Sequence, residues 1–270
     1  MPEGPEIRRA ADRLAAAVAG VPLARAWFAF PDLKRFESEL VGARVEAISP
    51  RGKALLTRFD SGWTLYSHNQ LYGVWKIAPA GTLPDSGRSL RVALETADRA
   101  ILLYSASDVS MWRSDGIEAH PFLRGLGPDV LDPGLDATTV AARLLEPRFR
   151  GRALGALLLD QGFLAGMGNY LRSEVLFAAR LPPRRRPREL SPAELARLAS
   201  TLLAVPRLSY ATRGIEPARG MRGDYLTDTP DGFRFQVFDR EGAPCPACGA
   251  AIVREEIGSR RLYRCADCQR

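Results

Sequence analysis

The sequence predicts an α+β protein with a β-rich N-terminal part, a helical middle part and a short C-terminal module that holds every cysteine. Short apolar runs between residues 23 and 107 are separated by Gly, Asp, Ser or Pro, which is typical of antiparallel strands in a sandwich or barrel. Between residues 137 and 208 the apolar residues recur at helical spacing. All four cysteines lie in the last 26 residues. These changes of pattern indicate a multidomain chain.

The N-terminal part is expected to begin with a helix. In "PEIRRAADRLAAAVAG" the residues Ile7, Ala11, Leu14 and Val18 recur at helical spacing, and Gly20 ends the pattern. Strands are then expected in six runs, which are "ARVEAISP", "KALLTRF", "WTLYSH", "YGVWKIA", "LRVALET" and "AILLYSA".

The middle part is expected to be helical. Ser191 is predicted to be an N-cap, with Glu194 at the capping-box position. The predicted helices are "ATTVAARLLEP", "RALGALLLDQGFLA", "GNYLRSEVLFAAR" and "SPAELARLASTLLAVPRL". We therefore divide the chain into an N-terminal domain (1–125), a helical domain (126–215), a flexible loop (216–232) and a terminal module (233–270).

The net charge of the chain favours a polyanionic partner. Lysine and arginine number 38 against 31 acidic residues, which gives a formal charge of +7. Such a balance is most simply explained by nucleic acid. Only three of the basic residues are lysines, namely Lys34, Lys53 and Lys76. We find no apolar run of about 18 residues and no secretory signal. We therefore expect a soluble, cytoplasmic protein that does not associate with a membrane.

The four cysteines have the spacing C-x2-C-x16-C-x2-C, formed by Cys245, Cys248, Cys265 and Cys268. Two such pairs can surround one tetrahedral Zn²⁺, and a closed four-cysteine site is structural because it has no open position. Two disulfides or free thiols are the alternatives. The intervening "GAAIVREEIGSRRLYR" is suited to a β-hairpin with Arg260 near its tip, where it would contact a phosphate or a nucleobase, or only solvent.

A glycine-rich turn joins two of the predicted helices. In "AGMGN" two glycines allow a tight turn, and Asn169 then stands near the N-terminus of the next helix. Backbone N–H groups at a helix N-terminus favour an anion, so this turn is a candidate phosphate site. The alternative is a routine N-cap in a helical hairpin.

These motifs together resemble the formamidopyrimidine/endonuclease VIII DNA glycosylases. The resemblance rests on "PEGPE", "RGKALL", "GMGNYLRSE" and the four-cysteine finger with its arginine, and "WFAFP", "LYSHNQLYGVW" and "SYATRG" are similar to the endonuclease VIII branch. It implies an N-terminal β-sandwich with flanking helices, a helix–two-turns–helix domain and a zinc finger with one Zn²⁺. It also implies base excision followed by strand cleavage on double-stranded DNA that contains oxidised bases or abasic sites.

The resemblance implies roles for individual residues. Pro2, exposed by loss of Met1, would attack C1′ of the damaged nucleotide to form an iminium ion, and Glu3 would be the general acid. Lys53 would contact the scissile phosphate and donate a proton in β-elimination. Arg260 would bind a phosphate and assist δ-elimination.

Further residues are expected to contact DNA or to support the site. Gln70, Leu71 and Tyr72 would fill the gap left by the flipped nucleotide, although strand-end packing also explains them. Asn169 would hold the DNA backbone. The branch has a DNA-contacting arginine where this chain has Gly125, so the adjacent Arg124 becomes the candidate. Glu6 matches the "PE.PE" pattern in a supporting role.

The lesion preference is left with two alternatives. The endonuclease VIII branch implies oxidised pyrimidines, whereas "DYLTDTPDGF" is similar to the formamidopyrimidine branch and to preference for oxidised purines such as 8-oxoguanine. A third hypothesis, of another class, is a noncatalytic zinc protein that binds damaged DNA; the presence of Pro2, Glu3 and Lys53 argues against it. The protein is expected to act as a monomer.

Overall fold

The computed structural model describes residues 2–212 and 232–270, which form two compact units. The first unit contains Pro2 and residues 6–124, and the second contains residues 3–5 together with the described part of 125–270. The predicted loop 216–232 lies outside the described residues except for its last position. No helix in the described parts of the chain has the length and hydropathy needed to cross a bilayer.

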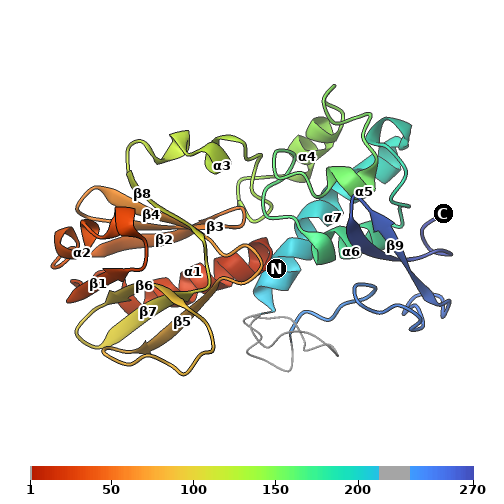
Figure 1. The fold of residues 1–270 in the computed structure, drawn as a ribbon. Helices are drawn as coiled ribbons and strands as arrows, with labels where there is room; N and C mark the ends of the chain where they lie inside the picture. Colours follow the sequence, from red (N-terminus) through yellow and green to blue (C-terminus); the bar gives the residue numbers. More distant parts are fainter. Residues whose placement is uncertain (1, 213–231) are drawn as a thin grey trace. The chain divides into compact units, whose positions relative to one another are not determined.

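The first unit is a sandwich of two antiparallel four-stranded sheets, which Figure 1 shows facing one another. One sheet has the strand order β1-β6-β7-β5, and the other has the order β2-β3-β4-β8. The strands are β1 (Arg25–Phe28), β2 (Val45–Arg51), β3 (Ala54–Phe59), β4 (Trp63–His68), β5 (Val74–Pro79), β6 (Leu90–Glu95), β7 (Arg99–Tyr104) and β8 (Asp108–Arg113). The fold class predicted from the sequence is thereby confirmed for this unit.

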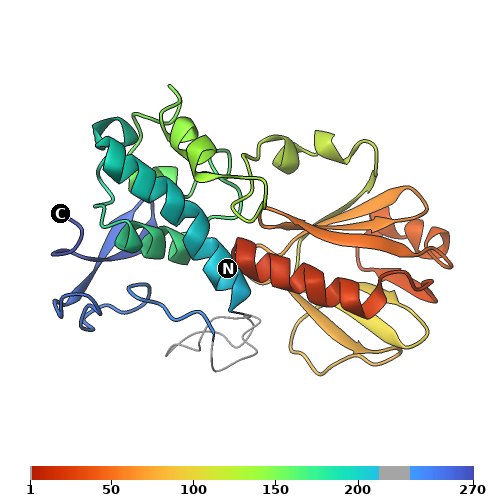
Figure 2. The same cartoon turned by 180° about the vertical axis from the view of Figure 1, so that it is seen from behind.

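Helix α1 (Gly4–Val18) runs along the sandwich, as Figure 2 shows. Its residues Ile7, Ala11, Leu14 and Val18 are buried in one cluster with strand residues such as Phe28. The apolar residues that recur at helical spacing in the sequence therefore form the face of α1 that completes the sandwich core. Short helices complete the unit: η1 (Pro31–Leu33), α2 (Phe36–Glu39), η2 (Ile117–Ala119) and α3 (Pro121–Arg124).

Two strands were not anticipated. Strand β1 has only four residues, and β8 begins after the stretch in which strands were expected. Along β8 nearly every side chain is half-buried, so the alternation that marks a strand is missing from "DVSMWR". The partner strand specifies β8 instead, because Trp63 to His68 pair with Arg113 to Asp108 in register.

The second unit is helical around its own core and ends in a hairpin. Its helices are α4 (Ala137–Leu144), α5 (Leu154–Leu157), α6 (Asn169–Ala178), η3 (Pro187–Glu189) and α7 (Pro192–Ala211). Ser191 caps α7 by accepting a hydrogen bond from the Glu194 N–H at 3.3 Å, and Glu194 completes the capping box. The hairpin consists of β9 (Ile252–Ile257) and β10 (Arg260–Cys265). Both features agree with the sequence prediction.

The predicted helix "RALGALLLDQGFLA" is wrong in its length. Only Leu154–Leu157 form α5, and the chain then turns. The Asp160 carboxylate accepts a hydrogen bond from the Gly162 N–H at 2.8 Å, which favours the turn over a further helical turn. The apolar spacing that suggested a helix has another cause, because Leu158, Phe163 and Leu164 are buried in the core of this unit.

Candidate functional site

The Glu3 carboxylate is bound at the N-terminus of α6. Its Oε1 accepts a hydrogen bond from the Tyr170 N–H at 2.8 Å, and its Oε2 accepts one from the Leu171 N–H at 3.2 Å. Glu3 is only 3% exposed. The first N–H groups of a helix lack partners within the helix and attract negative charge. The sequence suggested a phosphate at this helix end, but these two N–H groups donate instead to a carboxylate of the protein itself, the side chain next to Pro2.

Three glycines make this contact sterically feasible. The Gly4 N–H donates to the Gly166 carbonyl at 2.8 Å, and a Cβ on Gly4 would lie 3.1 Å from the Gly166 Cα. Gly166 has a φ of +93°, which favours glycine. A Cβ on Gly168 would lie 2.2 Å from the Glu3 Cδ. The glycines of "PEGPE" and "AGMGN" are thus required because the two segments pack backbone to backbone.

A buried arginine, Arg172, links the turn to the hairpin. It is fully buried and donates from Nη2 to the Asn169 Oδ1 at 2.6 Å and to the Arg261 carbonyl at 2.9 Å. Its Nη1 donates to the Gly155 carbonyl at 2.9 Å. Burial lowers the pKa of Arg172 to about 10; the Glu3 carboxylate opposes this shift and the Arg260 charge adds to it. The guanidinium therefore contacts Asn169 and the hairpin backbone, and it lies within the electrostatic influence of Glu3.

Sequence reasoning missed Arg172 and also Glu174. Glu174 is buried and accepts hydrogen bonds from the N–H groups of Gln236, Val237 and Phe238 at 2.8 to 3.0 Å. Burial raises its pKa, and the three backbone donors oppose that shift. The sequence carried no clear signal for either residue, because the burial of residues 170–176 of α6 is seen only in the structure.

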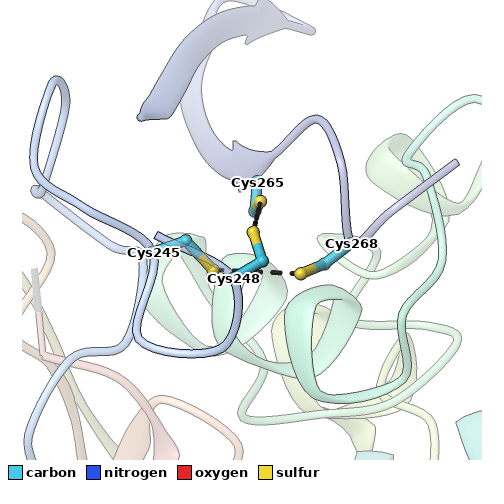
Figure 3. Close-up of side chains that lie close together, drawn as sticks. All are labelled: Cys245, Cys248, Cys265 and Cys268. Carbon is cyan, nitrogen blue, oxygen red and sulfur yellow. Dashed lines mark hydrogen bonds between the residues drawn. The ribbon is translucent and has the colours of Figure 1, made fainter. Parts of the chain in front are cut away.

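The four cysteines converge at the base of the hairpin, as Figure 3 shows. Their Sγ atoms lie within 4.8 Å of one another, with Cys248 and Cys265 at 3.4 Å and Cys245 and Cys268 at 3.9 Å. These separations are too long for disulfides, which need about 2.05 Å. Four sulfurs about 2.3 Å from one tetrahedral Zn²⁺ would lie about 3.8 Å apart, so the cluster fits a metal ion.

The second cysteine pair is fixed to the helical core by a residue that sequence reasoning did not identify. Gln269 is 1% exposed, and its Oε1 accepts a hydrogen bond from the Cys265 N–H at 3.0 Å. Its Nε2 donates to the Leu181 carbonyl at 3.0 Å. The cysteine cluster and the helical core of the unit are therefore coupled through one amide.

The remaining predicted catalytic residues lie in the first unit. Lys53 is half-buried in the two-residue turn between β2 and β3, where Gly52 has a φ of +61°. A glycine at the first turn position and an ordinary φ at the second are what a type II′ hairpin turn requires. Pro2 is half-buried. Glu6 is buried and accepts a hydrogen bond from Arg9 Nη2 at 2.7 Å, and its supporting role stays a prediction.

The three lysines differ in their surroundings. Lys34 pairs with Glu37 at 2.8 Å and lies over the Trp27 ring, and Lys76 lies over the Tyr104 ring. Packing on an aromatic ring therefore accounts for these two. Lys53 lies instead close enough to His68 for its charge to lower the pKa of that imidazole. It remains the lysine proposed for chemistry.

The candidate gap-filling residues form a tight exposed loop after β4. The Gly73 N–H donates to the Asn69 carbonyl at 2.7 Å, and a Cβ on Gly73 would lie 2.6 Å from that oxygen. Gln70 has a φ of +49° and accepts a hydrogen bond at Oε1 from the Ser107 hydroxyl at 3.0 Å. Leu71 and Tyr72 are 58% and 57% exposed. These two side chains are therefore not packed at the strand end, as the alternative interpretation expected.

Each of the two histidines accepts a hydrogen bond at Nδ1 from a backbone N–H two residues further along the chain. The Gln70 N–H donates to His68 Nδ1 at 3.0 Å, and the Phe122 N–H donates to His120 Nδ1 at 3.2 Å. Burial lowers the pKa of both imidazoles from 6.5; Asp108 opposes the shift at each, and Lys53 adds to it at His68. The neutral ring, with its proton on Nε2, is the form that can accept these bonds.

The backbone of Gln70 is expected to lose its acceptor as the pH falls below 6.5. Because the folded-state pKa of His68 is lowered, the contact is complete above that pKa and is lost as pH falls through it. Amide NMR spectra recorded from about pH 8 to about pH 5 should show Gln70 and Phe122 titrating. In His68→Asn, an amide oxygen can replace Nδ1 at all pH values, so Gln70 should then stay constant. A pH-independent Gln70 amide in the wild type would contradict this role of His68.

Arg124 is the last residue of the first unit. It is exposed at the end of α3, and its N–H donates to the His120 carbonyl at 3.0 Å. Gly125 begins the second unit. The assignment of Arg124 as a DNA contact stays a prediction.

The chain matches two models of known domains. Residues 1–107 match the formamidopyrimidine-DNA glycosylase N-terminal domain, and residues 126–216 match the formamidopyrimidine-DNA glycosylase H2TH domain. Among curated relatives, Endonuclease 8 of Enterobacter sp. (strain 638) is 54% identical over 270 residues, which covers all of both chains. Endonuclease 8 of Escherichia coli O17:K52:H18 is 53% identical over 269 residues, again with complete coverage.

The fold is also similar to that of solved structures. The Lactococcus lactis Fpg protein in complex with DNA containing N7-benzyl-Fapy-dG has a TM-score of 0.83 at 20% identity, with 99% of each chain covered. The same protein in complex with DNA containing an abasic site also has a TM-score of 0.83 at 20% identity and 99% coverage of each chain. At this identity the likeness establishes the fold.

Proposed function

Because the chain belongs to the formamidopyrimidine-DNA glycosylase family, in the branch of the bacterial endonuclease 8 proteins, we propose that it removes oxidised pyrimidines from double-stranded DNA and then cleaves the strand by β,δ-elimination. The family relationship makes the chain a DNA glycosylase and AP lyase of base-excision repair, so the noncatalytic alternative falls. What we propose beyond this family membership is the preference for oxidised pyrimidines and the roles of the individual residues.

The observation that carries the proposed chemistry is the placement of Glu3. Its carboxylate directly follows Pro2, is buried, and is fixed by two N–H groups of α6. A proton-transfer group must be held in a defined position beside the reacting atoms. Here a helix N-terminus holds that group next to the only backbone nitrogen that becomes a secondary amine when Met1 is removed.

The reaction would proceed through a covalent intermediate. The Pro2 amine attacks C1′ and the bond between C1′ and the base breaks; the base leaves with the electron pair of that bond and takes a proton from water. Glu3 takes the amine proton and passes it to the sugar ring oxygen, so that the ring opens and an iminium ion forms between Pro2 and C1′. The positive nitrogen acidifies the C2′ proton, which permits β-elimination and then δ-elimination.

Phosphate contacts would come from cationic and amide side chains. Lys53 stands on the tight β2–β3 turn, and Arg260 is exposed beside the hairpin turn. We assign both to phosphates near the lesion, with Lys53 donating a proton in β-elimination and Arg260 assisting δ-elimination by its charge. Asn169 is assigned to a third backbone contact. The exposed Leu71 and Tyr72, together with Gln70, would occupy the space of the flipped nucleotide, which costs roughly a few kcal/mol to extrude.

Single-turnover kinetics on defined duplexes test the proposed lesion preference. We expect faster base release from thymine glycol than from 8-oxoguanine, and strand cleavage at an abasic site with both elimination products. Glu3→Gln should slow base release by about 10²-fold or more, because it removes the proton-transfer group. Faster release of 8-oxoguanine would overturn the pyrimidine preference while leaving the chemistry intact.

We further propose that the four-cysteine cluster holds one Zn²⁺, with Cys245, Cys248, Cys265 and Cys268 as its ligands. The Sγ separations and the all-sulfur donor set support zinc. The bound ion would be structural, since four thiolates leave it no open position. It would fix the base of the hairpin that ends at Arg260.

Removal of the metal is expected to weaken binding to abasic-site DNA by about tenfold or more, because the hairpin loses the fixed base that positions Arg260. Affinity should be measured by fluorescence anisotropy on protein whose metal content has been checked, before and after Zn²⁺ is restored. Cys248→Ser should show the same loss. Ala247→Ser, at the exposed neighbouring position, should not. Unchanged binding by verified metal-free protein would count against this role.

A further inference from the structure

The loop 69–73 after β4 holds apolar side chains in an exposed position. Leu71 and Tyr72 are both exposed, and Gln70 before them has a φ of +49°. A left-handed φ is unfavourable for a residue other than glycine, and exposure of large apolar side chains to water is unfavourable as well. Contacts from the rest of the first unit are therefore needed to stabilise this conformation.

Three contacts hold the ends of the loop and its second residue. The Gly73 N–H closes the loop on the Asn69 carbonyl at 2.7 Å. Gln70 is held twice, by the His68 imidazole at its backbone N–H and by the Ser107 hydroxyl at its side chain, each at 3.0 Å. These three contacts do not reach the two apolar residues that follow Gln70.

An arginine from another loop holds the far side. Arg88 lies half-buried between β5 and β6, and its Nη1 donates to the Tyr72 carbonyl at 2.7 Å. The backbone beside Arg88 is itself tied down, because the Ser89 carbonyl accepts a hydrogen bond from the Ser105 N–H at 2.8 Å. The segment 105–107 between β7 and β8 therefore supports the loop directly through Ser107 and indirectly through Arg88.

We propose that Arg88 is a positioning residue that holds Leu71 and Tyr72 ready for insertion into the DNA stack before DNA is bound. The inference rests on the proposed function and deepens it, since Arg88 acts only through the loop. A loop that already has its binding conformation loses less conformational entropy when it binds. The benefit falls on the step in which the damaged base leaves the stack, because the two side chains then take its place.

Single-turnover kinetics on two substrates test the proposal. Arg88→Ala should slow base release from a thymine glycol duplex about fivefold, as expected for the loss of one hydrogen bond from a charged donor. Strand cleavage at a preformed abasic site should slow by less than about twofold, because no base has to leave the stack there. Equal losses on both substrates, or no loss with thymine glycol, would overturn the role of Arg88.

A mutant cycle shows whether the effect passes through the loop. In the Leu71→Ala/Tyr72→Ala background, Arg88→Ala should change base release by less than about twofold, because the side chains that it positions are absent. A loss as large as in the wild type would contradict the proposal. Arg44→Ala is the matched control, because its Nη1 also donates to a backbone carbonyl of the same unit, that of Gly20 at 2.6 Å. It should release base at the wild-type rate.

Hydrogen exchange in the free protein keeps the two proposals apart. The Gly73 amide is bonded to the Asn69 carbonyl, so its exchange rate reports opening of the loop. Arg88→Ala should raise that rate about fivefold, and Arg44→Ala should leave it unchanged. Unchanged exchange in Arg88→Ala would overturn the role of Arg88 whether or not the protein releases base. Faster exchange in Arg88→Ala, together with no base release by the wild type, would overturn only the proposed function.

Discussion

Gly168→Ala is expected to slow base release by about 10²-fold, since a displacement of about 1 Å in a catalytic group can have that effect. A Cβ at this position would lie 2.2 Å from the Glu3 Cδ and 2.4 Å from its Oε1 in the present geometry. The clash involves a buried carboxylate held by two N–H groups of α6, so Glu3 must leave its position. The measurement is single-turnover base release from a thymine glycol duplex.

A matched glycine controls for the general effect of adding a methyl group. A Cβ on Gly151 would meet nothing within 4 Å, so Gly151→Ala should retain wild-type kinetics. Thermal unfolding of both variants shows whether Gly168→Ala is folded at the assay temperature. A folded Gly168→Ala that releases base at the wild-type rate would refute the assignment of Glu3 as the proton-transfer group.

Extension of the chain by residues before Pro2 is expected to abolish base release and strand cleavage. In an extended chain the Pro2 nitrogen is a tertiary amide, whose lone pair is delocalised and cannot attack C1′. The contacts of Glu3 lie beyond this bond and can persist, so the fold and the affinity for abasic-site DNA should be retained. Pro2→Gly, which keeps a free primary amine, should keep part of the activity. Full activity with a blocked terminus would contradict the mechanism.

Much of the architecture follows from local sequence patterns. The run "WTLYSH" coincides with β4, and the apolar face of α1 is the one its spacing predicts. The four-cysteine spacing predicted a hairpin between two cysteine pairs, and β9 and β10 confirm it. In each case the residues that determine the element lie within the element or just beside it.

The features that local patterns did not predict depend on distant partners. Glu3 meets α6 across 167 positions of sequence, and nothing near residue 3 indicates that contact. The apolar spacing around α5 reflects burial of turn residues, so it suggested a helix that continues too far. Arg172 and Glu174 look like ordinary helix-surface charges until the partners of α6 are known.

The same limit applies to the candidate site. The motifs "PEGPE" and "GMGNYLRSE" were recognised separately, and the structure explains why both need glycine: Gly4, Gly166 and Gly168 allow the two segments to pack. The role of His68 beside Gln70 depends on one loop geometry. The domain boundaries predicted from the sequence, including the one between residues 125 and 126, stay a prediction. The same holds for the functional roles of the site residues.

The central claim is that the amine of Pro2 forms the covalent intermediate with DNA. The most direct measurement is borohydride reduction of the wild-type enzyme on DNA with a thymine glycol, followed by digestion and mass spectrometry of the cross-linked peptide. We predict that the peptide begins at Pro2, lacks Met1 and carries the sugar on its N-terminal nitrogen. A cross-link on Lys53 or any other side chain, with Pro2 unmodified, would contradict the account.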